Sequence, residues 1–189
     1  MIQTILYFHG FASSSESSKA QIIKKYISSN YKDIKIYTPN LSNDFKEAVE
    51  EIENLVKQNK NIAFMGCSLG GYYALYFSQL HRSKAILINP AIPPLEGFEV
   101  YLGENENFST REKFSITKKD INTFLSDSNR QKIFKRILIC TTNHFSRQGL
   151  KTIKFQEKKV QIIALQNLID KGNIFPNSIK NLSKKNVNE

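Results

Sequence analysis

The chain has 189 residues, of which 40% are hydrophobic and 23% are charged, a composition typical of one globular domain rather than of a disordered or fibrous protein. No apolar run reaches the length of a membrane span, and the N-terminus lacks the basic and apolar regions of a signal peptide, so we expect a cytoplasmic protein without a membrane partner. The net charge is +10, yet the lysines are spread along the chain and form no motif with interleaved aromatics, so we expect no specific nucleic-acid partner.

Short apolar runs with the character of buried strands alternate with segments of helical periodicity. The predicted strands are residues 5–8, 34–37, 62–65, 85–88, 137–140 and 160–165. The predicted helices cover residues 22–27, 44–60, 69–80, 117–125, 150–155 and 177–183, and the second should begin at Asp44 with Glu47 as its capping-box partner. Because strands that alternate with helices pair in parallel through right-handed crossovers, the pattern predicts a three-layer α/β/α sandwich around a mostly parallel sheet of about six strands.

Residues 91–117 break this alternation. They contain two consecutive prolines, two glycines and isolated aromatic side chains, which indicates a loop-rich insertion within a single domain of residues 1–189. Some of the aromatics could line a small apolar pocket over the site, although ordinary packing also accounts for each of them: Phe98, Tyr101, Phe108 and Phe114.

The segment Gly66-Cys67-Ser68-Leu69-Gly70 lies between a predicted strand and a predicted helix. It matches the G-x-S-x-G nucleophile elbow of α/β-hydrolases, in which the serine occupies a sharp strand-to-helix turn. Such a turn brings the backbone close to itself, so small residues are needed at Gly66 and Gly70. Ser68 is therefore predicted to be the nucleophile of a compact α/β-hydrolase fold, with a tight turn that carries no chemistry as the alternative.

The residues around the elbow have predicted roles of their own. The backbone N–H groups of Phe11 and Leu69 are the expected oxyanion-hole donors. We expect His9 to order its loop through hydrogen bonds, with a role as general base as the alternative. Cys67 and Cys140 lie in apolar runs, so we expect free thiols, and Cys67 is interpreted as an apolar filler with a reactive thiol as the alternative.

Several segments resemble the YqiA-like family of small bacterial esterases. They are Tyr7-Phe8-His9-Gly10-Phe11-Ala12-Ser13-Ser14, the elbow continued by Gly71-Tyr72-Tyr73, the turn Ile88-Asn89-Pro90-Ala91, and residues 101–103 and 110–114 of the insertion. The resemblance implies hydrolysis of short-chain carboxylic esters by a Ser-His-Asp triad, with a small-molecule ester as substrate and without a metal or other cofactor.

The chain departs from the family pattern where the acid and the base of the triad should lie. The family places its aspartate after the penultimate strand in a Gly-Asp-Glu-like turn, where this chain has Thr-Thr-Asn-His-Phe-Ser at residues 141–146. The family's histidine follows the last strand, where this chain has Asp-Lys-Gly-Asn-Ile-Phe at residues 170–175, and no histidine follows His144. An intact family triad is therefore not expected.

Three histidines remain as candidate bases. His9 follows the first strand, His81 lies at the far end of the helix after the elbow, and His144 lies in a loop at the expected end of the sheet. A rearranged triad, with Ser68 as nucleophile, His144 as base and Asp170 as the orienting acid, is the hypothesis under which the protein is an active esterase. Two alternatives stay open: a catalytically impaired protein of the same fold that acts as a binding or regulatory module, and a C-terminal third that diverged or was altered at the gene level.

Overall fold

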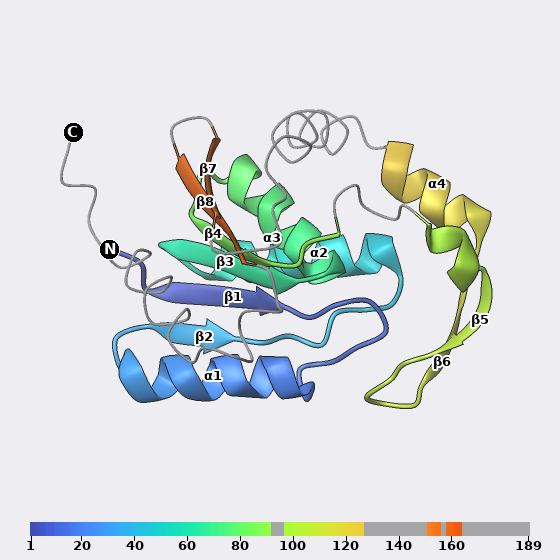
Figure 1. Cartoon of the computed structure of the whole chain (residues 1–189), viewed down its shortest axis with the longest axis horizontal. Coiled ribbons are helices and arrows are strands. Elements are labelled where there is room, and N and C mark those ends of the chain that lie inside the picture. The colour runs from blue at the N-terminus through green and yellow to red at the C-terminus, as the bar shows by residue number, and fades with distance from the viewer. Residues whose placement is uncertain (92–96, 127–150, 156–157, 164–189) are drawn as a thin grey trace.

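The structure is a computed structural model, and it describes residues 1–91, 97–126, 151–155 and 158–163. Its centre is a sheet of six described strands in the order β2-β1-β3-β4-β8-β7 (Figure 1). Five of these strands run parallel, and β7 pairs antiparallel to β8 at one edge. The bounds are β1 Thr4–Phe8, β2 Lys35–Tyr37, β3 Ile62–Cys67, β4 Ala85–Ile88, β7 Lys151–Phe155 and β8 Lys158–Ile163.

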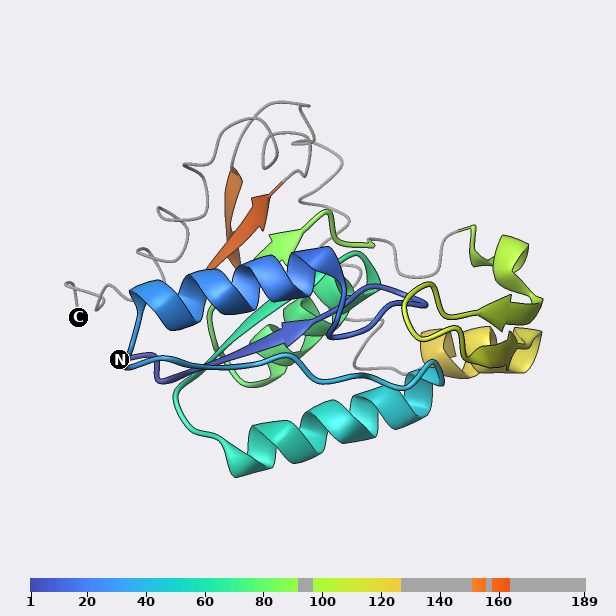
Figure 2. The same ribbon diagram turned by 90° about the horizontal axis from the view of Figure 1, so that it is seen from below.

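Helices cover both faces of this sheet. The helix α1, Ser18–Asn30, packs on the face that carries Ile5, Tyr7 and Met65. The helices α2, Phe45–Gln58, and α3, Leu69–Leu80, pack on the opposite face, and Figure 2 shows α1 and α2 on opposite sides of the strands. Because successive side chains of a strand point to opposite faces, β1, β3 and β4 must be apolar almost throughout. The predicted α/β/α sandwich is confirmed.

Local signals in the sequence determine where α2 begins. The carboxylate of Asp44 accepts hydrogen bonds from the backbone N–H groups of Lys46 and Glu47, at 2.8 and 2.9 Å. The side chain of Glu47 does not complete a direct capping box. It accepts instead from the hydroxyl of Ser42, whose oxygen accepts from the N–H of Asp44. The predicted cap is therefore present, with Ser42 inserted between its two members.

Some predicted elements are wrong in detail. Residues 150–155 were expected to form a helix, but Lys151–Phe155 is the strand β7, because antiparallel pairing with β8 gives its backbone the hydrogen bonds that a helix would otherwise supply. The first helix extends beyond the expected residues 22–27 to Ser18–Asn30, and Ile22 and Leu80 are exposed. The strand expected at 137–140 and the helix expected at 177–183 lie outside the described residues.

The insertion contains more regular structure than expected. It holds a 3-10 turn, η1 Phe98–Tyr101, and an antiparallel hairpin of β5 Gly103–Glu106 and β6 Lys113–Ile116, followed by α4 Lys118–Ser126. These elements lie beyond the carboxyl ends of the parallel strands (Figure 1). The turn of the hairpin is bonded to the loop after β1, through Phe108 N–H to Ala12 O at 2.8 Å and Asn107 Nδ2 to Ser13 O at 2.9 Å. No helix in the described part of the chain is long and apolar enough to cross a membrane.

Candidate active site

Ser68 occupies the turn between β3 and α3 in a strained backbone conformation. Its φ is 54° and its ψ is −121°, a region that residues with a side chain seldom adopt. Hydrogen bonds hold this conformation, because Ser68 N–H donates to Ile88 O at 3.1 Å and Ser68 O accepts from the N–H groups of Gly71 and Ala91, each at 2.9 Å. The side chain itself is exposed. The turn therefore presents a hydroxyl to solvent on a backbone that cannot relax.

Gly66 and Gly70 make the sharp turn possible. A Cβ on Gly66 would collide with the backbone carbonyl of Gly70, and a Cβ on Gly70 would collide with the carbonyls of Phe8 and His9. The chain thus passes over itself at the elbow, and the loop after β1 lies directly on the first turn of α3. Any side chain at either glycine would force these segments apart.

Two backbone N–H groups beside Ser68 have no hydrogen-bond acceptor among the described residues. Leu69 is the first residue of α3, where an N–H has no partner within its own helix. Phe11 lies in the loop after β1, and its neighbour Gly10 approaches the elbow so closely that a Cβ there would lie 3.4 Å from Ser68 Cβ. The two N–H groups that were predicted to be the oxyanion-hole donors therefore lie near the serine, and neither has a hydrogen-bond acceptor among the described residues.

The imidazole of His9 is bonded to the backbone on both sides of its ring. Its Nε2 accepts from the N–H of Leu41 at 2.9 Å, so the proton must lie on Nδ1, which donates to Gly10 O at 2.8 Å. Burial lowers the pKa of His9, and the bond to Gly10 opposes this only in part. The ring is thus neutral and has no free nitrogen with which to accept a proton from Ser68.

His81 lies far from Ser68. His81 ends α3, and its ring stacks on Phe77 with a centroid distance of 6.2 Å. A helix of 12 residues separates it from Ser68 by roughly 18 Å at 1.5 Å per residue. His144 and Asp170 lie outside the described residues.

A cavity of about 450 Å³ opens at Ser68. Its lining includes four aromatic residues of the loop after β1 and of the insertion: Phe11, Phe98, Tyr101 and Phe108. It also includes Ser17, Ser18 and Lys19 at the start of α1, together with Tyr7 and Cys67. Three of the four insertion aromatics singled out in the sequence therefore line the cavity, whereas Phe114 packs behind it against Phe11 at a ring distance of 5.5 Å.

Cys67 is a free, buried thiol on the floor of this cavity. Burial raises its pKa, although the ammonium of Lys19, 3.8 Å from its sulfur, pulls the pKa in the opposite direction. Because a nucleophilic thiol requires a lowered pKa, this environment suits the predicted filler role rather than the reactive one. No sequence pattern indicated the nearby Lys19, which reaches the cavity from α1.

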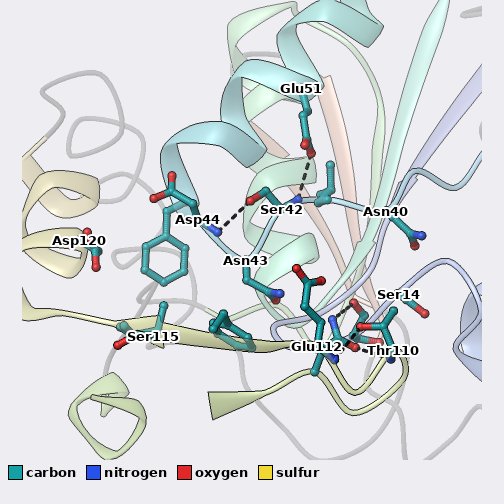
Figure 3. Close-up of a pocket in the computed structure, with 16 residues that line it drawn as sticks. Ser14, Asn40, Ser42, Asn43, Asp44, Glu51, Thr110, Glu112, Ser115 and Asp120 are labelled. Carbon is teal, nitrogen blue, oxygen red and sulfur yellow. Dashed lines mark hydrogen bonds between the residues drawn. The ribbon is translucent and has the colours of Figure 1, made fainter. Parts of the chain in front are cut away.

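A second cavity, of about 360 Å³, lies between the start of α2 and the β5–β6 hairpin (Figure 3). Its lining is polar and includes the carboxylates of Asp44, Glu51, Glu112 and Asp120. Ser68 does not line it, so it is separate from the elbow. Within the described ranges, no three His, Cys, Asp or Glu side chains are grouped closely enough to hold a metal ion.

This arrangement of sheet, elbow and covering helices is the α/β-hydrolase fold. The structure is similar to Est1E from Butyrivibrio proteoclasticus, with a TM-score of 0.53 and 12% identity over 86% of this chain and 78% of that chain. It is also similar to the S-formylglutathione hydrolase FrmB from Staphylococcus aureus, with a TM-score of 0.51 and 16% identity over 96% of this chain and 73% of that chain. At these identities the likeness establishes the fold.

Sequence comparison then gives the family. The model described as "Uncharacterised protein family (UPF0227)" matches residues 4–146, and the chain belongs to this family. A UPF0227 protein of Citrobacter koseri is 24% identical over 143 residues, and the UPF0227 protein YcfP of Salmonella gallinarum is 23% identical over 143 residues, each match covering 74% of both chains. The resemblance noted in the sequence is confirmed at this level. The matched segment includes Ser68 and His144, and Asp170 lies beyond it.

Proposed function

We propose that this protein is a serine hydrolase that cleaves short-chain carboxylic esters or thioesters, with Ser68 as the nucleophile. The observation that carries the proposal is the elbow itself: a strained, exposed serine at φ 54° that lines a cavity, beside two backbone N–H groups that have no acceptor among the described residues. Backbone strain is characteristic of functional sites, and a structural turn has no need of a hydroxyl in a strained position. Neighbours of the same fold include a protein described as a hydrolase.

In the proposed reaction, Ser68 Oγ forms a bond to the ester carbonyl carbon as its proton passes to the general base. The oxygen that becomes negative is stabilised by the N–H groups of Phe11 and Leu69. The bond to the leaving alcohol or thiol then breaks, and the leaving group takes the proton from the base. Water attacks the acyl-enzyme by the same route, which releases the carboxylic acid and restores Ser68.

The base in this proposal is His144, with Asp170 as the acid that orients it. Elimination supports His144, because the chain has three histidines, His9 has both ring nitrogens bonded to backbone, and His81 lies at the opposite end of α3. His9 is assigned instead to ordering the loop that carries Phe11.

The test is turnover of 4-nitrophenyl acetate and butyrate by the purified protein. Ser68→Ala should lower kcat by several orders of magnitude, since the nucleophile and its base act as a unit. Ser28→Ala, at an exposed position of α1, should leave the rate unchanged. His144→Ala should lower kcat about as far as Ser68→Ala, and Asp170→Asn less.

Two results would contradict the proposal. A rate that is the same in wild type and Ser68→Ala would show that the elbow does no chemistry. A folded wild-type protein that neither turns over these esters nor is labelled at Ser68 by a fluorophosphonate would favour the binding or regulatory module instead. If Ser68→Ala is inactive while His144→Ala retains full activity, the nucleophile stands and the rearranged base is wrong.

A further inference from the structure

Lys19 is a cation placed beside the nucleophile. Both Lys19 and Ser68 line the 450 Å³ cavity, although they belong to different elements. The ammonium nitrogen of Lys19 lies 3.8 Å from the sulfur of Cys67, the residue that immediately precedes Ser68. An anionic group held by Lys19 would therefore lie within a few bonds of a carbonyl group at the serine.

Nothing in the described part of the chain neutralises this ammonium. The ion pairs among the described residues are Lys46–Glu50 and Arg111–Glu106, and neither involves Lys19. The cavity lining contains no Asp or Glu among the described residues. The hydrogen-bond partner of Lys19 is the thiol of Cys67, which stays uncharged because burial raises its pKa. The positive charge is thus available to a ligand.

The start of α1 adds to the positive potential. First turns of helices favour acidic residues, which offset the partial positive charge of the helix dipole, but the first turn of α1 has none and contains Lys19. The cap of this helix, Ser17, accepts from the N–H of Ala20. The N–H groups of Ser18 and Lys19 have no acceptor within the described ranges, so the helix end can itself bind an anion.

We infer that the substrates are esters that carry a carboxylate group close to the scissile bond, with the carboxylate held by Lys19 and the start of α1. This inference rests on the proposed function and specifies its substrate class. The aromatic side chains that line the same cavity accommodate the short apolar remainder of the molecule. A neutral ester fits the same cavity but leaves the ammonium of Lys19 without an anionic partner.

Pairs of esters that differ in charge alone test the inference. 4-Acetoxybenzoate and 4-acetoxybenzamide place the charge in the alcohol part, whereas mono-4-nitrophenyl succinate and 4-nitrophenyl succinamate place it in the acyl part. Wild type should have the higher kcat/KM for the anion of at least one pair, and the preference should weaken as salt is added. Which pair responds identifies the side of the ester that faces Lys19.

Lys19→Met should lower this anion-to-amide ratio by about fivefold, the size expected of an ion pair that remains open to solvent. Lys24→Met is the matched control, because Lys24 is exposed on the same helix and does not line the cavity, and the ratio should keep its wild-type value. A wild-type ratio near one for both pairs, or an equal ratio in wild type and Lys19→Met, would overturn the inference while leaving the esterase proposal intact.

A binding measurement separates the two proposals if no ester is turned over. Calorimetry with Ser68→Ala protein compares 4-acetoxybenzoate with 4-acetoxybenzamide, and mono-4-nitrophenyl succinate with 4-nitrophenyl succinamate. In at least one pair the anion should bind more tightly than its amide, and this difference should disappear in the double variant that carries both Ser68→Ala and Lys19→Met. Equal affinities within both pairs would refute the anion site whatever the catalytic outcome.

Discussion

The backbone N–H of Leu41 donates a 2.9 Å hydrogen bond to Nε2 of His9, and this bond gives the histidine a structural role. It joins the loop after β1 to the loop after β2, 32 residues along the chain. The bond from Nδ1 to Gly10 O holds the other side of the ring. The loop that carries the N–H of Phe11 is therefore anchored beside the elbow by a neutral imidazole.

This arrangement predicts an acid-dependent loss of stability. Burial lowers the pKa of His9 below its ordinary value of 6.5, so below pH 6.5 the unfolded chain binds a proton that the folded chain does not. The free energy of unfolding then falls as the pH drops from 6.5 to the folded pKa, by at most about 1.4 kcal/mol per pH unit from this group. Urea unfolding at about pH 7.5 and about pH 5.5 measures the loss.

His9→Gln is the informative variant, because its side-chain oxygen can still accept from Leu41 N–H but does not titrate. It should lose less stability than wild type between the two pH values. Burial also lowers the pKa of His81, although Glu53 opposes the shift, so His81 contributes a separate part in the same direction that His81→Gln removes. Equal losses in wild type and His9→Gln would show that His9 is protonated in the folded state as readily as in the unfolded one.

Ser68 should cost the protein stability. At φ 54° and ψ −121° glycine is unstrained, whereas a residue with a Cβ carries a penalty on the order of 1–3 kcal/mol. Ser68→Gly should therefore raise the free energy of unfolding by about 1 kcal/mol, with the gain reduced by the flexibility of glycine in the unfolded chain. Ser68→Ala, which keeps the Cβ, should unfold like wild type. A lower free energy of unfolding in Ser68→Gly than in wild type would show that the backbone at Ser68 is not strained.

Gly70 should tolerate no side chain. A Cβ there collides with the carbonyls of Phe8 and His9, which belong to the backbone and cannot rotate away, so Gly70→Ala should cost about 3 kcal/mol or more. Gly97→Ala is the control: its φ is unfavourable for a side chain at 72°, but no atom of the described residues lies within 4 Å of the added methyl. It should cost about 1 kcal/mol. Thermal unfolding of both variants measures the difference, and equal melting temperatures would show that the elbow can open.

Phe98 should couple the insertion to the oxyanion loop. Its buried ring contacts Phe11 at a centroid distance of 4.7 Å and Phe45 at 5.8 Å, so it joins the loop after β1 to α2. Phe98→Ala should destabilise the protein by about 3 kcal/mol and lower kcat, because Phe11 loses the ring that holds it in place. Phe108 lines the same cavity but is 69% exposed.

Phe108→Ala is thus the control for Phe98→Ala. It should change the free energy of unfolding by less than about 0.5 kcal/mol and alter KM rather than kcat, since its ring lines the cavity but is exposed rather than packed in the core. Unfolding curves and steady-state kinetics on 4-nitrophenyl butyrate distinguish the two variants. Similar stability losses in both would show that the exposed ring of Phe108 packs as tightly as the buried ring of Phe98.

Local patterns determined most of the sheet in advance. The runs at β1, β3 and β4 are apolar on both faces because helices cover both sides, and this requirement is visible in a short segment. The elbow was equally predictable, since the turn at Ser68 demands small residues at fixed spacing and a strand and a helix on either side. The start of α2 at Asp44 could also be predicted, because a helix cap accepts hydrogen bonds from residues only two and three positions away.

Only the tertiary structure showed which residues contact one another when they lie far apart in the sequence. The bond of His9 to Leu41, the contact of Lys19 with Cys67 and the docking of Asn107 on Ser13 join residues that are 32, 48 and 94 positions apart. β7 was mistaken for a helix because its strand character depends on β8 as a pairing partner. The sequence alone determined that Ser68 lies on a nucleophile elbow, since that geometry is local. Chain folding brings separate elements to one edge of the sheet. It is therefore the tertiary structure that bonds the His9 ring to the backbone and that places Lys19 in the same cavity as Ser68.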